Sequence, residues 1–114
     1  MSLQDAAWNG DLEALRERIE RGDDVDGRDA RGRTPLLRAC GLGHNECARA
    51  LTDAGAAVNM VNNHGSTALM IACDFGHLER SRALIDAGAA VDTVDNDGLT
   101  AIMRACIPGR HECA

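Results

Sequence analysis

The chain has 114 residues, enough for one compact domain or a few stacked repeats, and only 2% of them are aromatic. Its formal net charge is −6, so we expect no unaided binding to nucleic acid or to an anionic membrane, because both require a continuous basic surface. No apolar run approaches the roughly 20 residues that span a bilayer, and no signal peptide is evident, so we expect a cytoplasmic or nuclear location.

The first segment, residues 1–33, is predicted to contain two helices. In the second helix Leu12, Leu15 and Ile19 recur at offsets of three and four residues, the spacing of an amphipathic helix. Gly22 follows this helix, as expected for a glycine that ends a helix in the left-handed conformation. One helix pair of this size cannot bury its own apolar stripe, so the stripe must pack against a neighbouring unit.

The next segment begins with "TPLLRAC" at Thr34, and similar heptapeptides begin at Thr67 and Thr100, so the same pattern returns twice after 33 residues. Threonine can cap a helix and proline is tolerated at the first helical position, so each heptapeptide predicts a helix start. A period in this range indicates stacked repeats. We divide the single domain, 1–114, into repeats of about 1–33, 34–66 and 67–99 and a partial repeat, 100–114.

Polar stretches link the predicted helix pairs. Gly32, Gly65 and Gly98 lie in these stretches at the same period, where they predict tight turns. Each unit is therefore expected to be helix, turn, helix and projecting loop. The predicted fold class is all-α, a solenoid of stacked helix-turn-helix units with hairpin-like loops.

The stretch "GRTPLLRACGLGHNECARALTDAGAAVN" resembles an ankyrin repeat, with its threonine-proline helix start, its glycine-histidine turn and its loop entry. The "GHLE" and "DAGAAVD" of the following repeat agree, and the resemblance covers nearly the whole chain. It implies a module that binds a protein or peptide on a concave face of loop tips and first helices. The family's usual histidine after the first-helix leucine is replaced by Leu37, Met70 and Met103, so we expect apolar contacts there.

Family geometry implies which residues face a partner. They are Trp8, Arg28, Arg31, Arg33, Arg38, Leu42, His64, Ile71, Phe75, Asp97 and Leu99. The only tryptophan and the only phenylalanine are among them, and aromatic and arginine side chains often dominate binding energy. The alternative that Trp8, Leu42 and Phe75 merely cover repeat junctions stays open.

Charge varies along this face, with arginines in the first repeats and aspartates in the later ones. Asp29, Asn62 and Asp95 are expected to bond to the backbone of their own loops. Arg31, Arg33 and Asp97 have no such role and are expected to point outward. A partner should therefore place an acidic segment over the first repeats and a basic segment over the later ones.

The last repeat stops early in its second helix, which predicts exposed apolar surface. Ile102, Met103 and Cys106 lie on its first helix and are candidates for self-association. The alternative is therefore a structural unit that assembles with copies of itself into a homo-oligomer, or a fragment of a longer ankyrin array that associates through this repeat.

No catalytic, cofactor or metal site is predicted. Cys40, Cys73 and Cys106 follow the repeat and are expected to pack between helices as reduced thiols. His44 belongs to a glycine-histidine turn and is expected to fix it; with Cys47 it lacks the four converging ligands of a zinc site. The acidic clusters lack the ligand spacing of a calcium loop. A thiol redox protein is the remaining enzymatic alternative.

Overall fold

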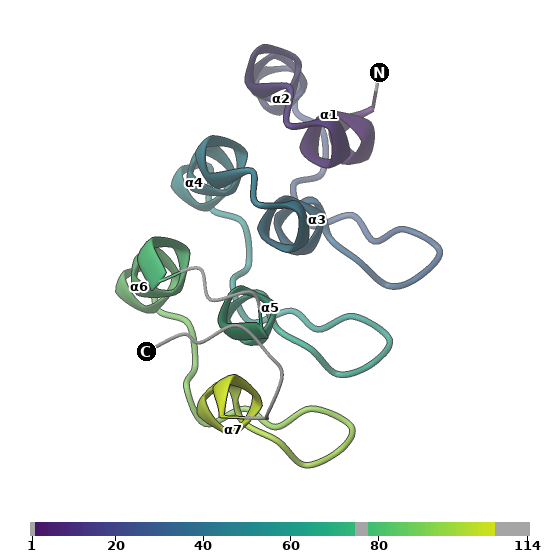
Figure 1. The fold of residues 1–114 in the computed structure, drawn as a ribbon. Helices are drawn as coiled ribbons and strands as arrows, with labels where there is room; N and C mark the ends of the chain where they lie inside the picture. Colours follow the sequence, from purple (N-terminus) through teal and green to yellow (C-terminus); the bar gives the residue numbers. More distant parts are fainter. Residues whose placement is uncertain (1, 75–77, 107–114) are drawn as a thin grey trace.

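The computed structural model describes residues 2–74 and 78–106, which form helices and no strand. The helices are α1 (Leu3–Asn9), α2 (Leu12–Glu20), α3 (Pro35–Leu42), α4 (Asn45–Asp53), α5 (Ala68–Asp74), α6 (Leu78–Asp86) and α7 (Ala101–Ala105). Helices α1, α3, α5 and α7 stack in one layer, and α2, α4 and α6 form a second layer beside them (Figure 1). The chain extends over 41 × 24 × 24 Å, the elongated shape of a short solenoid.

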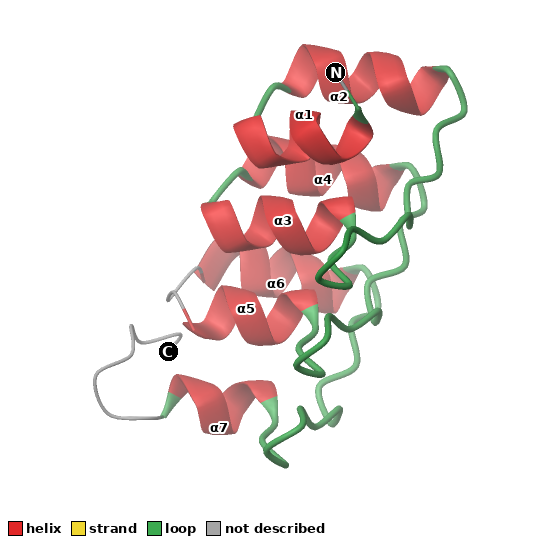
Figure 2. Cartoon of the chain, turned by 90° about the vertical axis from the view of Figure 1, so that its right-hand side faces the viewer, coloured by secondary structure: helices red, strands yellow, loops and turns green. Residues whose placement is uncertain are grey.

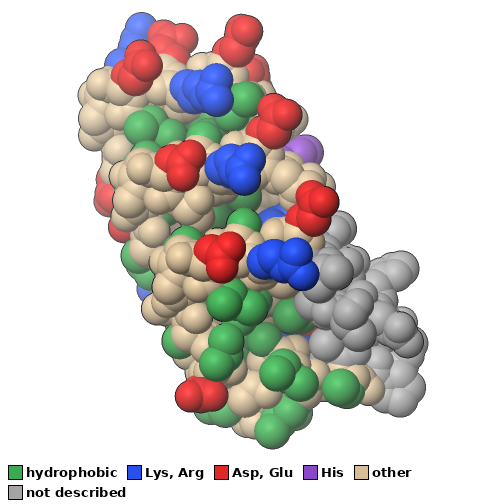
Figure 3. Space-filling view, turned by 90° about the vertical axis from the view of Figure 1, so that its left-hand side faces the viewer, with side chains coloured by type: hydrophobic (Ala, Val, Ile, Leu, Met, Phe, Trp, Pro, Cys, Tyr) green, Lys and Arg blue, Asp and Glu red, His purple; other side chains and the backbone are tan. Residues whose placement is uncertain are grey.

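The solenoid has two main surfaces, the first-helix face and the outer face. The first-helix face consists of α1, α3, α5 and α7 with the tips of the projecting loops, residues 28–33, 61–66 and 94–99 (Figure 2). The outer face consists of α2, α4 and α6 and lies on the opposite side of the molecule (Figure 3). Each first helix packs on the next one, α1 on α3, α3 on α5 and α5 on α7, so this layer is continuous.

The predicted helix starts at the three threonines are confirmed. The hydroxyl oxygens of Thr34, Thr67 and Thr100 each accept a hydrogen bond, at 3.3 Å, from the backbone N–H three residues later. Pro35 stands at the first position of α3, where the missing N–H costs nothing. The capping threonine therefore fixes the start of each of these helices.

The loop tips are stacked on one another by backbone contacts. The N–H of Asn63 donates to the carbonyl of Arg31 at 3.3 Å, and the N–H of Asn96 donates to the carbonyl of His64 at 3.1 Å. Gly32 has a φ of +75°, and a Cβ there would collide with the side chain of Asn63. Glycine is required at this position both by the left-handed backbone and by the close approach of the next loop.

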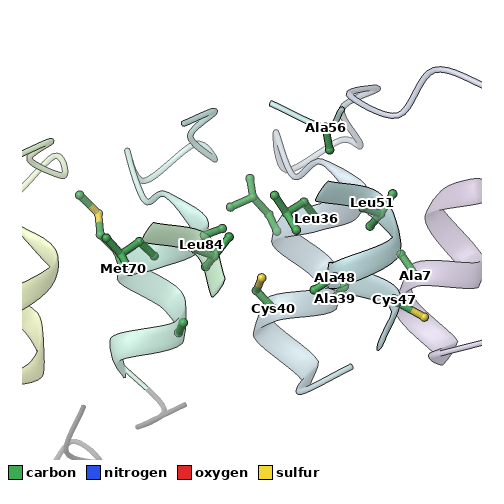
Figure 4. Packing of buried hydrophobic residues seen from close by; sticks show 14 of the residues in the cluster. Ala7, Leu36, Ala39, Cys40, Cys47, Ala48, Leu51, Ala56, Met70 and Leu84 are labelled. Carbon is green, nitrogen blue, oxygen red and sulfur yellow. The ribbon is translucent and has the colours of Figure 1, made fainter. Parts of the chain in front are cut away.

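The core lies between the two layers and between successive repeats. Small residues such as Ala39 and Ala72 are fully buried, which lets neighbouring helices approach closely. Leu15, Leu51 and Leu84 of the second layer are buried as well, and Figure 4 shows Ala39, Leu51 and Leu84 within the buried cluster. Stability therefore comes from repeat stacking, as the amphipathic pattern predicts.

Two core predictions can be checked by burial. Leu37 and Met70, which replace the family's usual histidine, are buried, at 3% and 1% exposure, which agrees with the expected apolar contacts. Met103, at the same repeat position, is 51% exposed, so the apolar contact expected for it is wrong. Cys40 and Cys73 are buried as predicted, but Cys106 is exposed, so the packing role expected for it is wrong. The reason is that α5 is the one described helix on which α7 packs extensively, whereas α3 and α5 also pack on the second helix of their own repeats, α4 and α6.

Candidate protein-binding face

Trp8 and two arginines form a cluster at the N-terminal end of the first-helix face. The guanidinium carbons of Arg33 and Arg38 lie 5.3 and 5.2 Å from the centre of a Trp8 ring, within the range of cation–π contacts. Trp8 nevertheless remains 44% exposed. The side chain is therefore held against α3 and its loop while much of its surface still faces solvent.

Both arginines also bind Asp29 in the loop before α3. Asp29 Oδ2 accepts hydrogen bonds from the Nε atoms of Arg33 and Arg38, each at 2.9 Å, and Oδ1 accepts from the backbone N–H groups of Arg31 and Arg33. Burial alone would raise the pKa of Asp29, but these four bonds hold that pKa well below its usual range. Asp29 is therefore ionised at neutral pH and offsets part of the arginine charge.

This cluster corrects one prediction about the charge of the face. Arg33 was expected to point outward without a role in its own loop, and this is wrong, because the turn brings Asp29 within reach of its side chain. Arg28 also bonds internally, since its Nη1 donates to the carbonyl oxygens of Gly32 at 3.3 Å and Val61 at 2.5 Å. Arg31 is exposed and forms no ion pair with the described residues.

The middle of the first-helix face is apolar. Leu42 is 44% exposed at the end of α3, and Ile71 on α5 is half-buried. Ile71 lies beside Gly41, where an added Cβ would come 3.7 Å from Ile71 Cγ2. Phe75, another predicted binding residue, lies outside the described residues. Leu42 and Ile71 therefore belong to the two helices, α3 and α5, that pack on each other at this junction.

An ion-pair cluster at the C-terminal end of the face involves Arg104. Its Nε donates to Asp74 Oδ1 at 3.0 Å, its Nη2 also binds Asp74, and its Nη1 donates to Ser66 Oγ at 2.7 Å. Nη1 also lies 3.7 Å from Asp95 Oδ2. This cluster was not predicted from the sequence. The repeat position of Arg104 could have revealed the cluster, because Arg104 stands two periods after Arg38, which also binds a loop aspartate.

The later loop tips present the remaining predicted residues. His64 and Asp97 are exposed, and Leu99 is half-buried. Asn62 Oδ1 accepts two backbone N–H bonds inside its loop, and Asp95 Oδ1 does the same, which confirms their predicted role. The tips are therefore rigid supports for the side chains that they expose.

The glycine-histidine turn contacts the preceding repeat. His44 Nε2 lies 3.0 Å from the carbonyl oxygen of Trp8, so the tautomer with its proton on Nε2 donates to the end of α1. His44 thus has a structural role, as predicted, and it also supports the backbone that carries Trp8. His77, in the next such turn, lies outside the described residues.

The described cysteines and acidic residues bear on thiol and metal chemistry. Burial raises the pKa of the Cys40 thiol to about 12, although the charge of nearby Arg80 acts in the opposite direction. Within residues 2–74 and 78–106, no group of three histidine, cysteine, aspartate or glutamate side chains gathers in a way that could hold a metal ion. In the same part of the chain, no helix is long and apolar enough to cross a membrane.

The outer face has a different character. Acidic and basic side chains lie in rows over α2, α4 and α6, and hydrophobic side chains gather beyond the last row (Figure 3). An open groove of about 580 Å³ runs between α4 and α6, and it is lined by residues that include Arg49, Glu79 and Arg80. Among the described residues, none of the predicted binding residues lines this groove.

Comparison with known proteins agrees with the helix pairs, capping threonines and stacked loops described above. A family model described as ankyrin repeats, in three copies, matches residues 3–95 and 54–114. The chain belongs to the ankyrin repeat family. Ankyrin repeats are in general protein–protein interaction modules, and the family is typically non-enzymatic.

Similar curated proteins share only a part of their length with this ankyrin repeat chain. Ankyrin repeat domain-containing protein oryK of Aspergillus oryzae is 39% identical over 56 residues, which is 49% of this chain and 9% of that protein. Ankyrin repeat domain-containing protein 13B is 44% identical over 52 residues in both Mus musculus and Homo sapiens, which is 45% of this chain and 8% of each protein. The chain thus matches less than a tenth of each relative's length.

Proposed function

We propose that this chain binds a protein or peptide on its first-helix face and catalyses no reaction. The observation that carries the proposal is Trp8, which is 44% exposed yet fixed by two guanidinium groups. A large aromatic side chain that is already ordered loses little conformational entropy on binding. Tryptophan and arginine are also the residue types most enriched among those that dominate binding energy.

The partner of this face carries opposite charges at its two ends. Arg31 is exposed on the first described loop tip and Asp97 is exposed on the last one. Arg33 and Arg38 contribute less to the field than their number suggests, because Asp29 lies between them. Such exposed charges mainly steer and orient the partner, and their effect is screened by salt.

The test is a comparison of variants on the two faces. Proteins captured by the immobilised chain are identified by mass spectrometry, and the binding of a purified candidate is measured in real time. Trp8→Ala should weaken binding about tenfold or more, whereas Arg49→Ala on the outer face should not. Equal loss in both variants, or loss only for Arg49→Ala, would overturn the proposal. A thermal unfolding curve for each variant separates lost contact from lost fold.

We also propose self-association through the last described repeat. Ile102 and Met103 are 68% and 51% exposed, whereas the corresponding Leu69 and Met70 of the preceding repeat are buried at 3% and 1%. The side chains that stabilise an internal repeat are thus exposed on α7. Exposed apolar surface of this kind favours association with another molecule.

A further inference from the structure

We propose that the first-helix face binds its partner through one apolar side chain that is seated over the backbone of Gly41. The site consists of Gly41 and Leu42 on α3 and Ile71 on α5, and we call it the Gly41 site. This inference rests on the proposed protein-binding function and specifies the chemistry of the partner. The first reason is that the fold itself does not require glycine at position 41.

Gly41 lies inside α3 and does not have a positive φ, so any residue can adopt its backbone conformation. Among the described residues, an added Cβ would meet only Ile71 Cγ2 within 4 Å, at an ordinary contact distance of 3.7 Å. Alanine would therefore fit, and it favours a helix more than glycine does. A glycine that packing does not need leaves room for another molecule to approach the helix backbone closely.

The equivalent positions in the neighbouring repeats are filled. Trp8 and Asp74 stand one period before and after Gly41. Each contacts the arginine 30 positions later, Trp8 by its ring and Asp74 by its carboxylate. At the junction between α3 and α5, Gly41 has no side chain and faces Ile71. Among the described residues, the same place on the solenoid surface thus carries a side chain in two junctions and none in the middle one.

The surroundings determine what kind of group fits this place. Leu42 is exposed and Ile71 is half-buried, so the walls are aliphatic. The flanking arginines are already paired, Arg38 with Asp29 and Arg104 with Asp74, so a charged partner group would gain no free counter-ion here. An aliphatic or aromatic side chain is the best match, because it removes apolar surface from water without leaving a charge unpaired.

Charge on the loop tips sets the direction of the partner segment. Exposed Arg31 belongs to the tip beside α3, and exposed Asp97 belongs to the tip beside α7. The partner is therefore a peptide segment with a central apolar residue, an acidic residue on the Arg31 side and a basic residue on the Asp97 side. Trp8 reports on this event, because it is the only tryptophan and lies against Arg38, one turn before Gly41.

The experiment uses short random peptides displayed as a library and selected on the intact chain. Enriched peptides are synthesised, and their affinity is measured by the fluorescence of Trp8 and by calorimetry. Gly41→Leu fills the site with the chain's own side chain and should weaken these peptides about tenfold or more. Ala83→Leu adds the same group to an exposed position of α6 and is the matched control. The unfolding midpoints should show that both variants are folded.

The outcomes separate this inference from the proposed function. Enriched peptides that share an apolar residue and that lose affinity in Gly41→Leu, but not in Ala83→Leu, support the inference. Peptides that respond to Trp8→Ala and Arg31→Glu while ignoring Gly41→Leu overturn the inference and leave the proposed function intact. Peptides that ignore all substitutions on the first-helix face contradict both, and a library without enrichment also overturns the inference.

Discussion

Trp8 lies over Arg38, with the guanidinium carbon 5.2 Å from a ring centre. The two residues are 30 positions apart, and the same separation joins Gly41 to Ile71 and Asp74 to Arg104. Each junction between neighbouring first helices therefore has a residue pair at this separation, which is a cation–π pair in the first junction, a glycine beside an isoleucine in the second and an ion pair in the third. The three junctions should consequently respond differently to substitution.

Asp74→Asn tests the last junction. The variant removes the charge that binds Arg104, whose side chain is 10% exposed, and hydrogen bonds to charged groups are worth about 1.5–3 kcal/mol. Because repeats contact only their neighbours, we expect faster amide hydrogen exchange in α7 with little change in α1 and α2. Asp53→Asn on the exposed end of α4 is the control. Uniform loss of protection along the chain would contradict this local role.

Asp29→Asn tests the first cluster through pH. An asparagine can keep the loop bonds, as Asn62 does one period later, so the variant mainly removes the charge. The folded-state pKa of Asp29 is lowered, so its contribution is fully present above the unfolded pKa of about 3.9 and is lost as pH falls below that value. Wild type should therefore be more stable than the variant by about 1–3 kcal/mol at neutral pH. Chemical denaturation measured from pH 7 downwards should show that the difference in free energy of unfolding between wild type and Asp29→Asn decreases below about pH 4.

Leu69→Ala tests the phase of the repeat. Leu69 is 3% exposed on α5, and truncating a buried leucine costs about 2–5 kcal/mol. A short array has a small free energy of unfolding, so this loss is large enough to unfold the whole chain. The matched control is Leu42→Ala, because Leu42 is 44% exposed and its removal should change the denaturation midpoint little. An unchanged midpoint in Leu69→Ala would show that the assigned core is wrong.

Most of the fold could be predicted because a 33-residue period carries the same information several times. Thr34, Thr67 and Thr100 have one local role, capping the next helix, and this depends on neighbours in sequence. The contacts that were missed join different repeats. Asp26, for example, reaches the next repeat, where its Oδ1 accepts the N–H of Ala57 at 2.8 Å.

Arg80 shows why contacts between repeats are difficult to predict from the sequence. It stands one period after the buried Cys47, so the repeat pattern suggests a small apolar residue there. Instead the arginine is 5% exposed, donates to the carbonyl of Cys40 at 2.6 Å and also binds Asn45. A long side chain can reach a helix end in the neighbouring repeat, and periodicity alone does not reveal which end it reaches.

Cysteine reactivity distinguishes packed thiols from exposed ones. Cys40, Cys47 and Cys73 are buried, and burial raises the pKa of Cys40 to about 12 and also raises that of Cys47. Since the thiolate is the reactive form, these residues should be modified slowly in the folded protein. Cys106 is exposed and should react first. Alkylation at neutral pH followed by peptide mass spectrometry gives the rate for each cysteine. Fast alkylation of both Cys40 and one of Cys47 and Cys73 would favour the redox alternative.

Self-association through α7 gives a last prediction. Burying an isoleucine side chain is worth about 1.5–3 kcal/mol, so Ile102→Glu should weaken an assembly that buries this residue by about tenfold to a hundredfold. Leu42→Glu adds the same charge to another exposed apolar position, on α3, and should leave the assembly unchanged. Sedimentation equilibrium is measured over a range of concentrations in the presence of a reductant, because exposed Cys106 could otherwise form a disulfide.

The two variants also separate the two proposed surfaces. Leu42→Glu places a charge in the Gly41 site and should weaken peptide binding, whereas Ile102→Glu should not. If both substitutions dissociated the assembly equally, the association would involve the first-helix face rather than α7 alone. A strictly monomeric wild type at high concentration would contradict self-association, and peptide binding to that monomer would then stand as the function of the chain.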